Sequence, residues 1–171
     1  MSLYFRFFWL IFLAKRRTSL SPTDVSLIKL RVLPNDLDLN MHVNNGRYGT
    51  FMDLGRMDLI VRTGLLKLMR ERSWFPVVAD MHLRFLRPLN LWQRFQLETQ
   101  LLGWDERWFY FQQRFMSKEK VCTVGLIKVQ IRHGRKRVDT EEVLEQLDYK
   151  MNSPEIPKSV QQWINAIDNH L

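Results

Sequence analysis

Residues 33–48 read Leu-Pro-Asn-Asp-Leu-Asp-Leu-Asn-Met-His-Val-Asn-Asn-Gly-Arg-Tyr. Their polarity, together with the Pro and the Gly, predicts a loop between a strand-like run and a helix-like run. Asn44 or Asn45 is a suitable N-cap for that helix, because an Asn side chain accepts a free N–H of the first turn. The loop therefore places polar side chains near a helix N-terminus, where backbone N–H groups and the helix dipole favour developing negative charge. A carboxylate, an imidazole and such a helix end are groups that acyl-transfer chemistry uses.

The segments on either side of this loop predict a strand followed by a long buried helix. Residues 25–33 read as the strand. In residues 47–61, apolar side chains fall on two stripes at helical spacing, which is typical of a helix buried on most of its circumference. Gly64 predicts the end of this helix, and residues 65–72 predict a further short one.

The remainder of the chain predicts an antiparallel sheet. Four strand signals follow the helices, at residues 81–85, 95–101, 108–116 and 121–131. The clearest is residues 95–101, where apolar side chains alternate strictly with Gln and Glu. Residues 141–147 and 159–168 predict two short terminal helices. One antiparallel sheet of about five strands wrapped around one long helix is an α+β architecture.

The loop also carries a motif that resembles the hot-dog-fold thioesterases. Residues 38–45, Asp-Leu-Asn-Met-His-Val-Asn-Asn, are similar to the Asp-x-Asn-x-His-Val-Asn-Asn stretch of plant acyl-ACP thioesterases. With Tyr48, they also resemble the Asp-x-Asp…Tyr stretch of hydroxybenzoyl-CoA thioesterases. The resemblance covers roughly residues 25–132 in element order. It implies a hot-dog fold that hydrolyses acyl thioesters, acyl-CoA or acyl-ACP, as a homodimer or a dimer of dimers.

Three residues of the motif carry the chemistry that the resemblance implies. Asp38 matches the aspartate that activates water or attacks the thioester carbonyl. Asn40 would orient the substrate or hold water, and His42 would act as a base or polarise the attacking water. The structural alternatives are that Asp38 caps a turn and that His42 is a hydrogen-bonded structural histidine.

Further site residues lie in the helix that follows the loop. The backbone N–H groups of Asn45 and Gly46 correspond to the place where hydroxybenzoyl-CoA enzymes hold the thioester oxygen. Asp53 corresponds to an acidic residue that some hot-dog thioesterases carry, with a hydrogen bond to a neighbouring strand as its structural alternative. Asp36 is expected to face solvent or to shape the loop.

The charge balance predicts an anionic partner or simply a solvated basic surface. The chain has 26 Lys and Arg against 18 Asp and Glu, a net charge of +8. Arg84, Arg87 and the basic cluster at residues 132–137 would meet the phosphates of CoA. No RNA-binding pattern of interleaved aromatic and basic residues is visible, so nucleic acid is not an expected partner.

The length and the cysteine count restrict the remaining classes. A chain of 171 residues suits one domain, here residues 19–138 with extensions at residues 1–18 and 139–171. Cys122 is the only cysteine and lies in an apolar strand, which predicts a core thiol, no intrachain disulfide and a cytoplasmic location. His82, His133 and His170 lack metal-ligand spacing, so neither a metal nor a cofactor is expected.

Residues 3–14 are almost wholly apolar, and Lys15-Arg16-Arg17 follow directly. The run is shorter than the roughly 20 residues that cross a bilayer, and no signal-peptide cleavage pattern follows it. It predicts either a helix that packs on the domain or a second subunit, or an anchor at the surface of an anionic membrane. Because the motif begins downstream, residues 1–17 are expected to be dispensable for folding and hydrolysis.

The chain departs from two related families, which argues against the full catalytic set of the first and against the enoyl-thioester hydration of the second. Plant acyl-ACP thioesterases carry a further acidic residue and a cysteine near the position of residues 83–88, and this chain has neither there. Enoyl-thioester hydratases of the same fold show Asp-x-Asn-Pro-x-His, whereas here Asp38 and His42 are one residue closer and the Pro is missing. A non-catalytic acyl-binding module at a membrane is the third reading.

Overall fold

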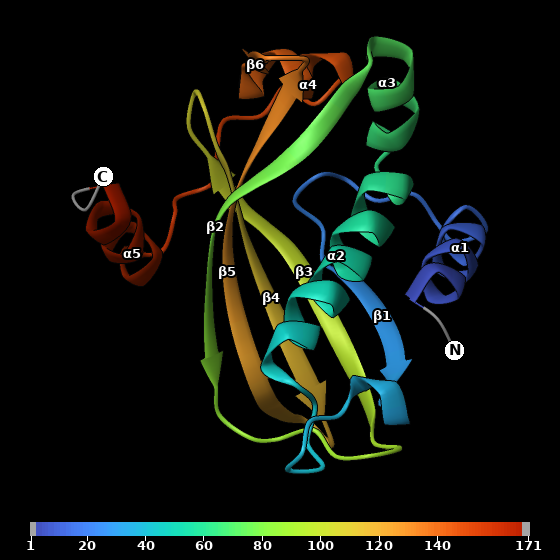
Figure 1. The fold of residues 1–171 in the computed structure, drawn as a ribbon. Helices are drawn as coiled ribbons and strands as arrows, with labels where there is room; N and C mark the ends of the chain where they lie inside the picture. Colours follow the sequence, from blue (N-terminus) through green and yellow to red (C-terminus); the bar gives the residue numbers. More distant parts are fainter. Residues whose placement is uncertain (1–2, 169–171) are drawn as a thin grey trace.

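A long helix, α2, lies across the concave face of a curled antiparallel sheet in the computed structural model, which describes residues 3–168 (Figure 1). The helices are α1 (Leu3–Ala14), the 3-10 turn η1 (Pro34–Asp36), α2 (Asn45–Arg62), α3 (Leu65–Arg72), α4 (Thr140–Gln146) and α5 (Lys158–Asp168). The strands are β1 (Ser26–Arg31), β2 (Trp74–Phe85), β3 (Arg94–Trp104), β4 (Phe109–Ser117), β5 (Lys120–His133) and β6 (Lys136–Val138). The predicted α+β class, the long helix and both terminal helices are confirmed.

The strands pair in the order β1-β3-β4-β5-β2, and the short β6 pairs with β5. The six strands agree with the prediction of about five, since β6 has only three residues. The strand predicted at residues 81–85 begins earlier, at Trp74. The sequence did not predict the first half of this strand, because Pro76 and a bulge between Val78 and Asp80 interrupt the alternation of apolar and polar side chains.

The core forms where α2 meets the sheet. Phe51, Met52 and Leu54 of α2 are almost completely buried, as are Leu97 and Phe115 of the sheet. Gly55 allows the close approach, because a Cβ there would lie 2.4 Å from the Thr99 hydroxyl of β3. The helix is therefore held at a fixed height above the strands, and with it the loop that precedes its N-terminus.

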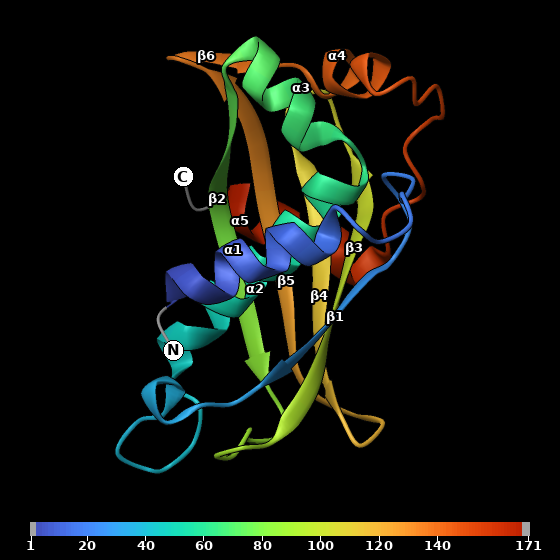
Figure 2. The ribbon, with the colours of Figure 1, turned by 90° about the vertical axis from the view of Figure 1, so that its right-hand side faces the viewer.

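The helix α1 packs against α2 and lies along the free edge of β1 (Figure 2). Arg6, Leu10 and Ala14 are buried on its inner side. Its outer side carries exposed large apolar side chains, namely Phe5, Phe8, Trp9, Phe12 and Leu13. The expectation that residues 1–17 are dispensable for folding does not agree with this packing. Within residues 3–168, no helix combines the length and the apolar character needed to cross a membrane.

Candidate functional site

Hydrogen bonds to the backbone and side chain of Asp38 hold the loop before α2 in shape. The Asp38 N–H donates to the His42 carbonyl over 2.9 Å, and the Met41 N–H donates to the Asp38 carbonyl over 3.1 Å. The Asp38 Oδ1 accepts the backbone N–H groups of Asn40 (2.8 Å) and His42 (3.4 Å). No described residue donates a hydrogen bond to its other oxygen, Oδ2. One carboxylate oxygen thus shapes the loop, as the structural alternative predicted, while the second remains available to a ligand.

The side chains of Asn40 and His42 are exposed beside this carboxylate. No hydrogen bond from the His42 imidazole to a residue in the described range is present, so the structural alternative for His42 finds no support. The loop backbone at His42 is fixed by a bridge to Asn90, which lies between β2 and β3. The loop therefore carries a partly exposed carboxylate and an exposed imidazole four residues apart.

The N-terminus of α2 offers one free amide. Asn44 is the N-cap, and its side chain accepts the Gly46 N–H over 2.9 Å. The Arg47 N–H donates to the Asn44 carbonyl over 2.9 Å. Within residues 3–168, the Asn45 N–H has no acceptor. The cap thus occupies the Gly46 amide, whereas the Asn45 N–H lies free near the positive end of the helix dipole.

Asp36 does not face solvent as expected but is fully buried behind the loop. Its carboxylate accepts two hydrogen bonds from Arg6 of α1 (2.7 and 3.2 Å), two from Arg47 (2.8 and 3.2 Å) and one from the Leu33 N–H (2.8 Å). Burial opposes ionisation, but the hydrogen bonds from both arginines outweigh it and lower the pKa of Asp36. The start of the loop is thus fixed to both α1 and α2.

Tyr48, the aromatic residue of the motif, is buried beneath the loop. Its ring packs edge-on against Phe85 and Phe115, with both centroids at 5.0 Å. Burial raises the pKa of the Tyr48 phenol, and the Asp38 carboxylate adds a smaller contribution. Tyr48 therefore remains protonated and supports the loop from the core side.

Asp53 stands apart from the loop. It lies eight residues along α2 from Asn45, which is about 12 Å of helix. Its exposed carboxylate pairs with Arg56, whose guanidinium also donates to the buried Gln113 over 2.8 Å. Burial lowers the pKa of Arg56, while the Asp53 charge opposes this shift. Arg56 thus links Asp53 to Gln113 of the sheet. No local sequence pattern could predict this link, because Gln113 is far from α2 in the chain.

An apolar cavity of about 580 Å³ lies between α2, α3 and the sheet, with Asp53 at its rim. Its walls include Met57, Ile60, Leu101, Phe111, Val129 and Ile131. Asp53 and Arg56 are the charged residues of the lining, and the apolar walls suit a hydrocarbon chain.

The two arginines predicted to meet CoA phosphates separate in the structure. In β2, Met81 contacts the α2 side at Gly49, and Phe85 packs on Tyr48. Because neighbouring side chains of a strand alternate, Arg84 points to the opposite face of the sheet. Arg87 lies in the following loop and donates to the Val121 carbonyl over 2.8 Å. Arg87 is three residues before Asn90, which bridges to the loop at His42. Arg84 points away from the site, because it lies on the opposite face of β2.

The remaining predictions concern metals and cysteine. In the part of the chain that the structure describes, no cluster of His, Cys, Asp and Glu could hold a metal ion. His170 lies outside the described residues. Cys122 is buried as predicted, and burial raises the pKa of its thiol, so it is not a thiolate nucleophile.

Three comparisons place this geometry among known proteins. The family model of the thioesterase-like superfamily matches residues 32–164. Protein THEM6 of Xenopus laevis is 35% identical over 138 residues, which cover 81% of this chain and 66% of that protein. A probable thioesterase of Escherichia coli matches with a TM-score of 0.67 at 22% identity, over 74% of this chain and 98% of its own. A hypothetical protein of Staphylococcus aureus, solved in complex with CoA, matches with a TM-score of 0.65 at 15% identity, over 84% of this chain and 96% of its own. The hot-dog fold is thereby confirmed.

Proposed function

Because the chain belongs to the thioesterase-like superfamily, whose model matches residues 32–164, we propose that it hydrolyses acyl-CoA thioesters at the loop before α2. The observation that carries this proposal is the position of Asp38. Its unpartnered carboxylate oxygen lies in the same loop as His42, directly before a helix N-terminus with a free amide at Asn45.

In the proposed reaction, Asp38 takes a proton from a water molecule that His42 polarises. The resulting hydroxide attacks the thioester carbonyl carbon. The tetrahedral oxyanion is stabilised by the Asn45 N–H and the dipole of α2. The C–S bond then breaks, and the proton held by Asp38 passes to the leaving thiolate. The products are a free acid and a thiol.

The apolar cavity beneath α2 supports an acyl substrate. It begins along the helix that starts at the proposed oxyanion site, and its lining offers burial to a hydrocarbon chain. The net charge of +8 and the exposed Arg87 support CoA as the thiol part, since CoA carries phosphates. The CoA found in the S. aureus structure supports the same assignment by analogy.

The two edges of the sheet support a homodimer formed through β2. The edge of β1 is covered by the N-terminal segment, because Arg6 and Arg17 donate to the carbonyls of Arg31 and Leu27. The edge of β2 has no such cover within the described residues, and Met81 and Phe85 are exposed there. An uncovered edge with apolar side chains needs a partner strand, and a second β2 provides one.

The outer side of α1 supports a peripheral membrane contact through residues 3–17. Phe8 is 67% exposed and Trp9 is 54% exposed, although both are large and apolar. Residues 3–17 contain no acidic side chain, and Lys15 and Arg16 are exposed at their end. Such a helix enters the headgroup region of an anionic membrane without crossing it.

Release of free thiol from a panel of acyl-CoA thioesters tests the function. Turnover by the wild-type chain supports the proposal, and binding of acyl-CoA without turnover indicates the acyl-binding module instead. Hydration of an enoyl-CoA without thiol release would assign the hydratase. The same panel with acyl carrier protein separates the two thiol carriers.

A further inference from the structure

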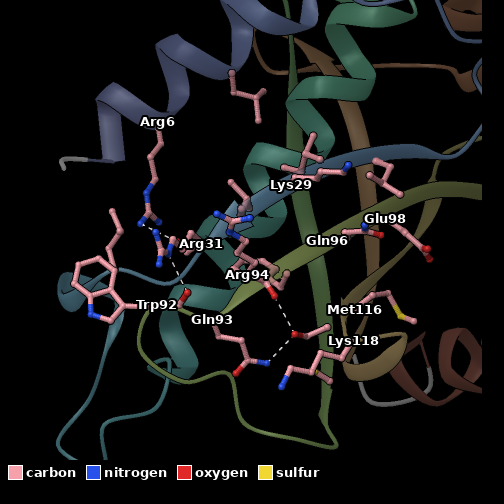
Figure 3. Close-up of a pocket in the computed structure, with 18 of the residues that line it drawn as sticks. Arg6, Lys29, Arg31, Trp92, Gln93, Arg94, Gln96, Glu98, Met116 and Lys118 are labelled. Atoms are coloured by element: carbon pink, nitrogen blue, oxygen red, sulfur yellow. Dashed lines mark hydrogen bonds between the residues drawn. The ribbon is translucent and has the colours of Figure 1, made fainter.

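A broad depression of about 1980 Å³ runs between α1 and the outer face of the sheet at β1 and β3 (Figure 3). It passes around the edge of β1: Lys29, Arg31 and Arg94 line it from the face that points away from α2, and Ile28 and Phe95 line it from the core side. Asp38, His42 and Asn45 of the proposed mechanism do not line it, and neither do the named walls of the apolar cavity, whereas Arg87, offered above for CoA, lies in its lining. Two properties distinguish it: cations without an acidic partner on one wall, and the exposed apolar side chains Trp9 and Leu13 on the other.

The cations come from two neighbouring strands. Arg31 of β1 lies directly opposite Arg94 of β3 in the register, and Lys29 lies opposite Gln96. Like charges directly opposite each other destabilise a sheet. Within residues 3–168, no acidic side chain pairs with Lys29, Arg31 or Arg94.

The acid nearest in the register does not relieve this repulsion. Glu98 lines the same depression, but its carboxylate is paired with Arg114 over 2.6 Å. The positive charge of this wall is therefore left for a ligand from outside the fold, and an anion is the class of ligand that it fits.

Trp92 stands at the end of this wall. It is 49% exposed and adopts a left-handed backbone with φ of 62°, which is unusual for a bulky residue. The Arg31 Nε donates to the Trp92 carbonyl over 2.9 Å, and the guanidinium lies 5.4 Å from the ring centroid. This conformation presents an indole beside the cations, an arrangement typical of protein surfaces at lipid headgroups.

The opposite wall belongs to α1. Trp9 and Leu13 line the depression, and both are also exposed at the surface of the molecule. The Arg16 guanidinium lies 3.9 Å from the Phe12 ring centroid at the end of the helix. An apolar rim beside a cationic floor matches an amphiphile with an anionic head better than a free nucleotide, because a nucleotide would leave the exposed rings uncovered.

We propose that this depression binds the phosphate groups of an anionic phospholipid bilayer, with the outer side of α1 inserted beside it. The proposal rests on the membrane contact proposed for α1, and it is independent of catalysis at Asp38. It assigns the choice of anionic lipid to Lys29, Arg31 and Arg94 and assigns insertion to the aromatic side chains of α1.

Co-sedimentation with vesicles tests the proposal, with the full chain and vesicles of phosphatidylcholine with and without phosphatidylserine. The variant is Lys29→Gln/Arg94→Gln, because neither side chain makes a hydrogen bond to a described residue. The matched control is Arg135→Gln/Lys136→Gln, an equally exposed pair at the β5–β6 turn. We expect the variant to lose roughly 30-fold in partition onto anionic vesicles and the control to lose much less.

Binding to pure phosphatidylcholine should be weak and equal for all three proteins, since it reports only the α1 side chains. An equal loss for variant and control on anionic vesicles would overturn the site, because it would reflect net charge alone. Displacement of the protein from anionic vesicles by CoA, together with a raised KM for a soluble acyl-CoA in the variant, would assign the depression to the nucleotide and also overturn it. An unchanged KM with lost vesicle preference supports the lipid site, whatever the outcome for catalysis.

Discussion

The carboxylates of Asp38 and Asp53 differ in what surrounds them, and the difference predicts their roles. Asp53 is neutralised by Arg56, whereas Asp38 keeps one oxygen without a protein partner. We expect Asp53→Asn to change kcat by less than about tenfold, since loss of a positioned base costs about 10²–10⁴-fold. Steady-state kinetics with a short acyl-CoA provide the measurement. A loss of a thousandfold would instead make Asp53 the base.

At Asp36, the lowered pKa predicts how stability depends on pH. The carboxyl has an ordinary pKa of 3.8, and its folded-state pKa is lower. Its contribution to stability is therefore complete above that ordinary value and is lost as pH falls through the folded-state pKa. Urea unfolding between pH 7 and pH 2 should show this loss in the wild type. Asp36→Asn should be less stable at neutral pH and should show a smaller further decrease on acidification; parallel pH profiles would contradict this.

At the scale of elements, α1 is joined to the loop before α2 by the buried pair of Arg6 and Asp36. Arg6 is 6% exposed and Asp36 is fully buried, so removal of Arg6 leaves a buried carboxylate with one partner fewer. Breaking such a pair typically costs about 3–5 kcal/mol. We expect Arg6→Met, or deletion of residues 1–17, to lower the melting temperature and kcat together.

Phe12→Ala serves as the control for that prediction, because Phe12 belongs to the same helix, is exposed and does not line the apolar cavity. It should keep the melting temperature and kcat of the wild type and lose only vesicle binding. A truncated chain that unfolds at the temperature of the wild type would show that α1 does not stabilise the domain.

The elements also show what the sequence could and could not predict. The alternation of apolar and polar side chains in residues 95–101 identified β3. The two apolar stripes of residues 47–61 identified α2, because burial against the sheet determines this spacing. The motif identified the loop. The contacts of Asp36 with Arg6 and of Arg56 with Gln113 were missed, because they join residues that are 30 and 57 positions apart in the chain. The first half of β2 was missed because Pro76 and the bulge remove its period.

At the scale of the whole molecule, the uncovered edge of β2 predicts a dimer with a particular interface. Met81 is 48% exposed on that edge. We expect the wild type to have a dimeric mass in light scattering at micromolar concentration. Met81→Glu should shift this mass towards the monomer, because dimer formation would bury one introduced carboxylate from each subunit in the interface. His82→Glu, on the other face of the same strand, is the matched control. A monomeric wild type would contradict the interface.

The assembled molecule carries three separate surfaces: the loop at the N-terminus of α2, the apolar cavity below the helix, and the basic depression beside α1. We propose the first two for hydrolysis and the third for membrane docking. Variants of Lys29 and Arg94 should therefore weaken binding to anionic membranes without changing turnover of soluble substrates. Variants of the loop should lower turnover without changing membrane binding.

The most direct test of the account is thiol release from acyl-CoA by the wild type and by Asp38→Asn. The Asn side chain keeps an oxygen that accepts the Asn40 N–H, so the loop should hold its shape and the melting temperature should change little. Asp148→Asn, an exposed position, controls for the loss of charge. The account predicts that the wild type and the control hydrolyse acyl-CoA and that Asp38→Asn loses about 10²–10⁴-fold in kcat. Turnover by a folded Asp38→Asn at the rate of the wild type would contradict it.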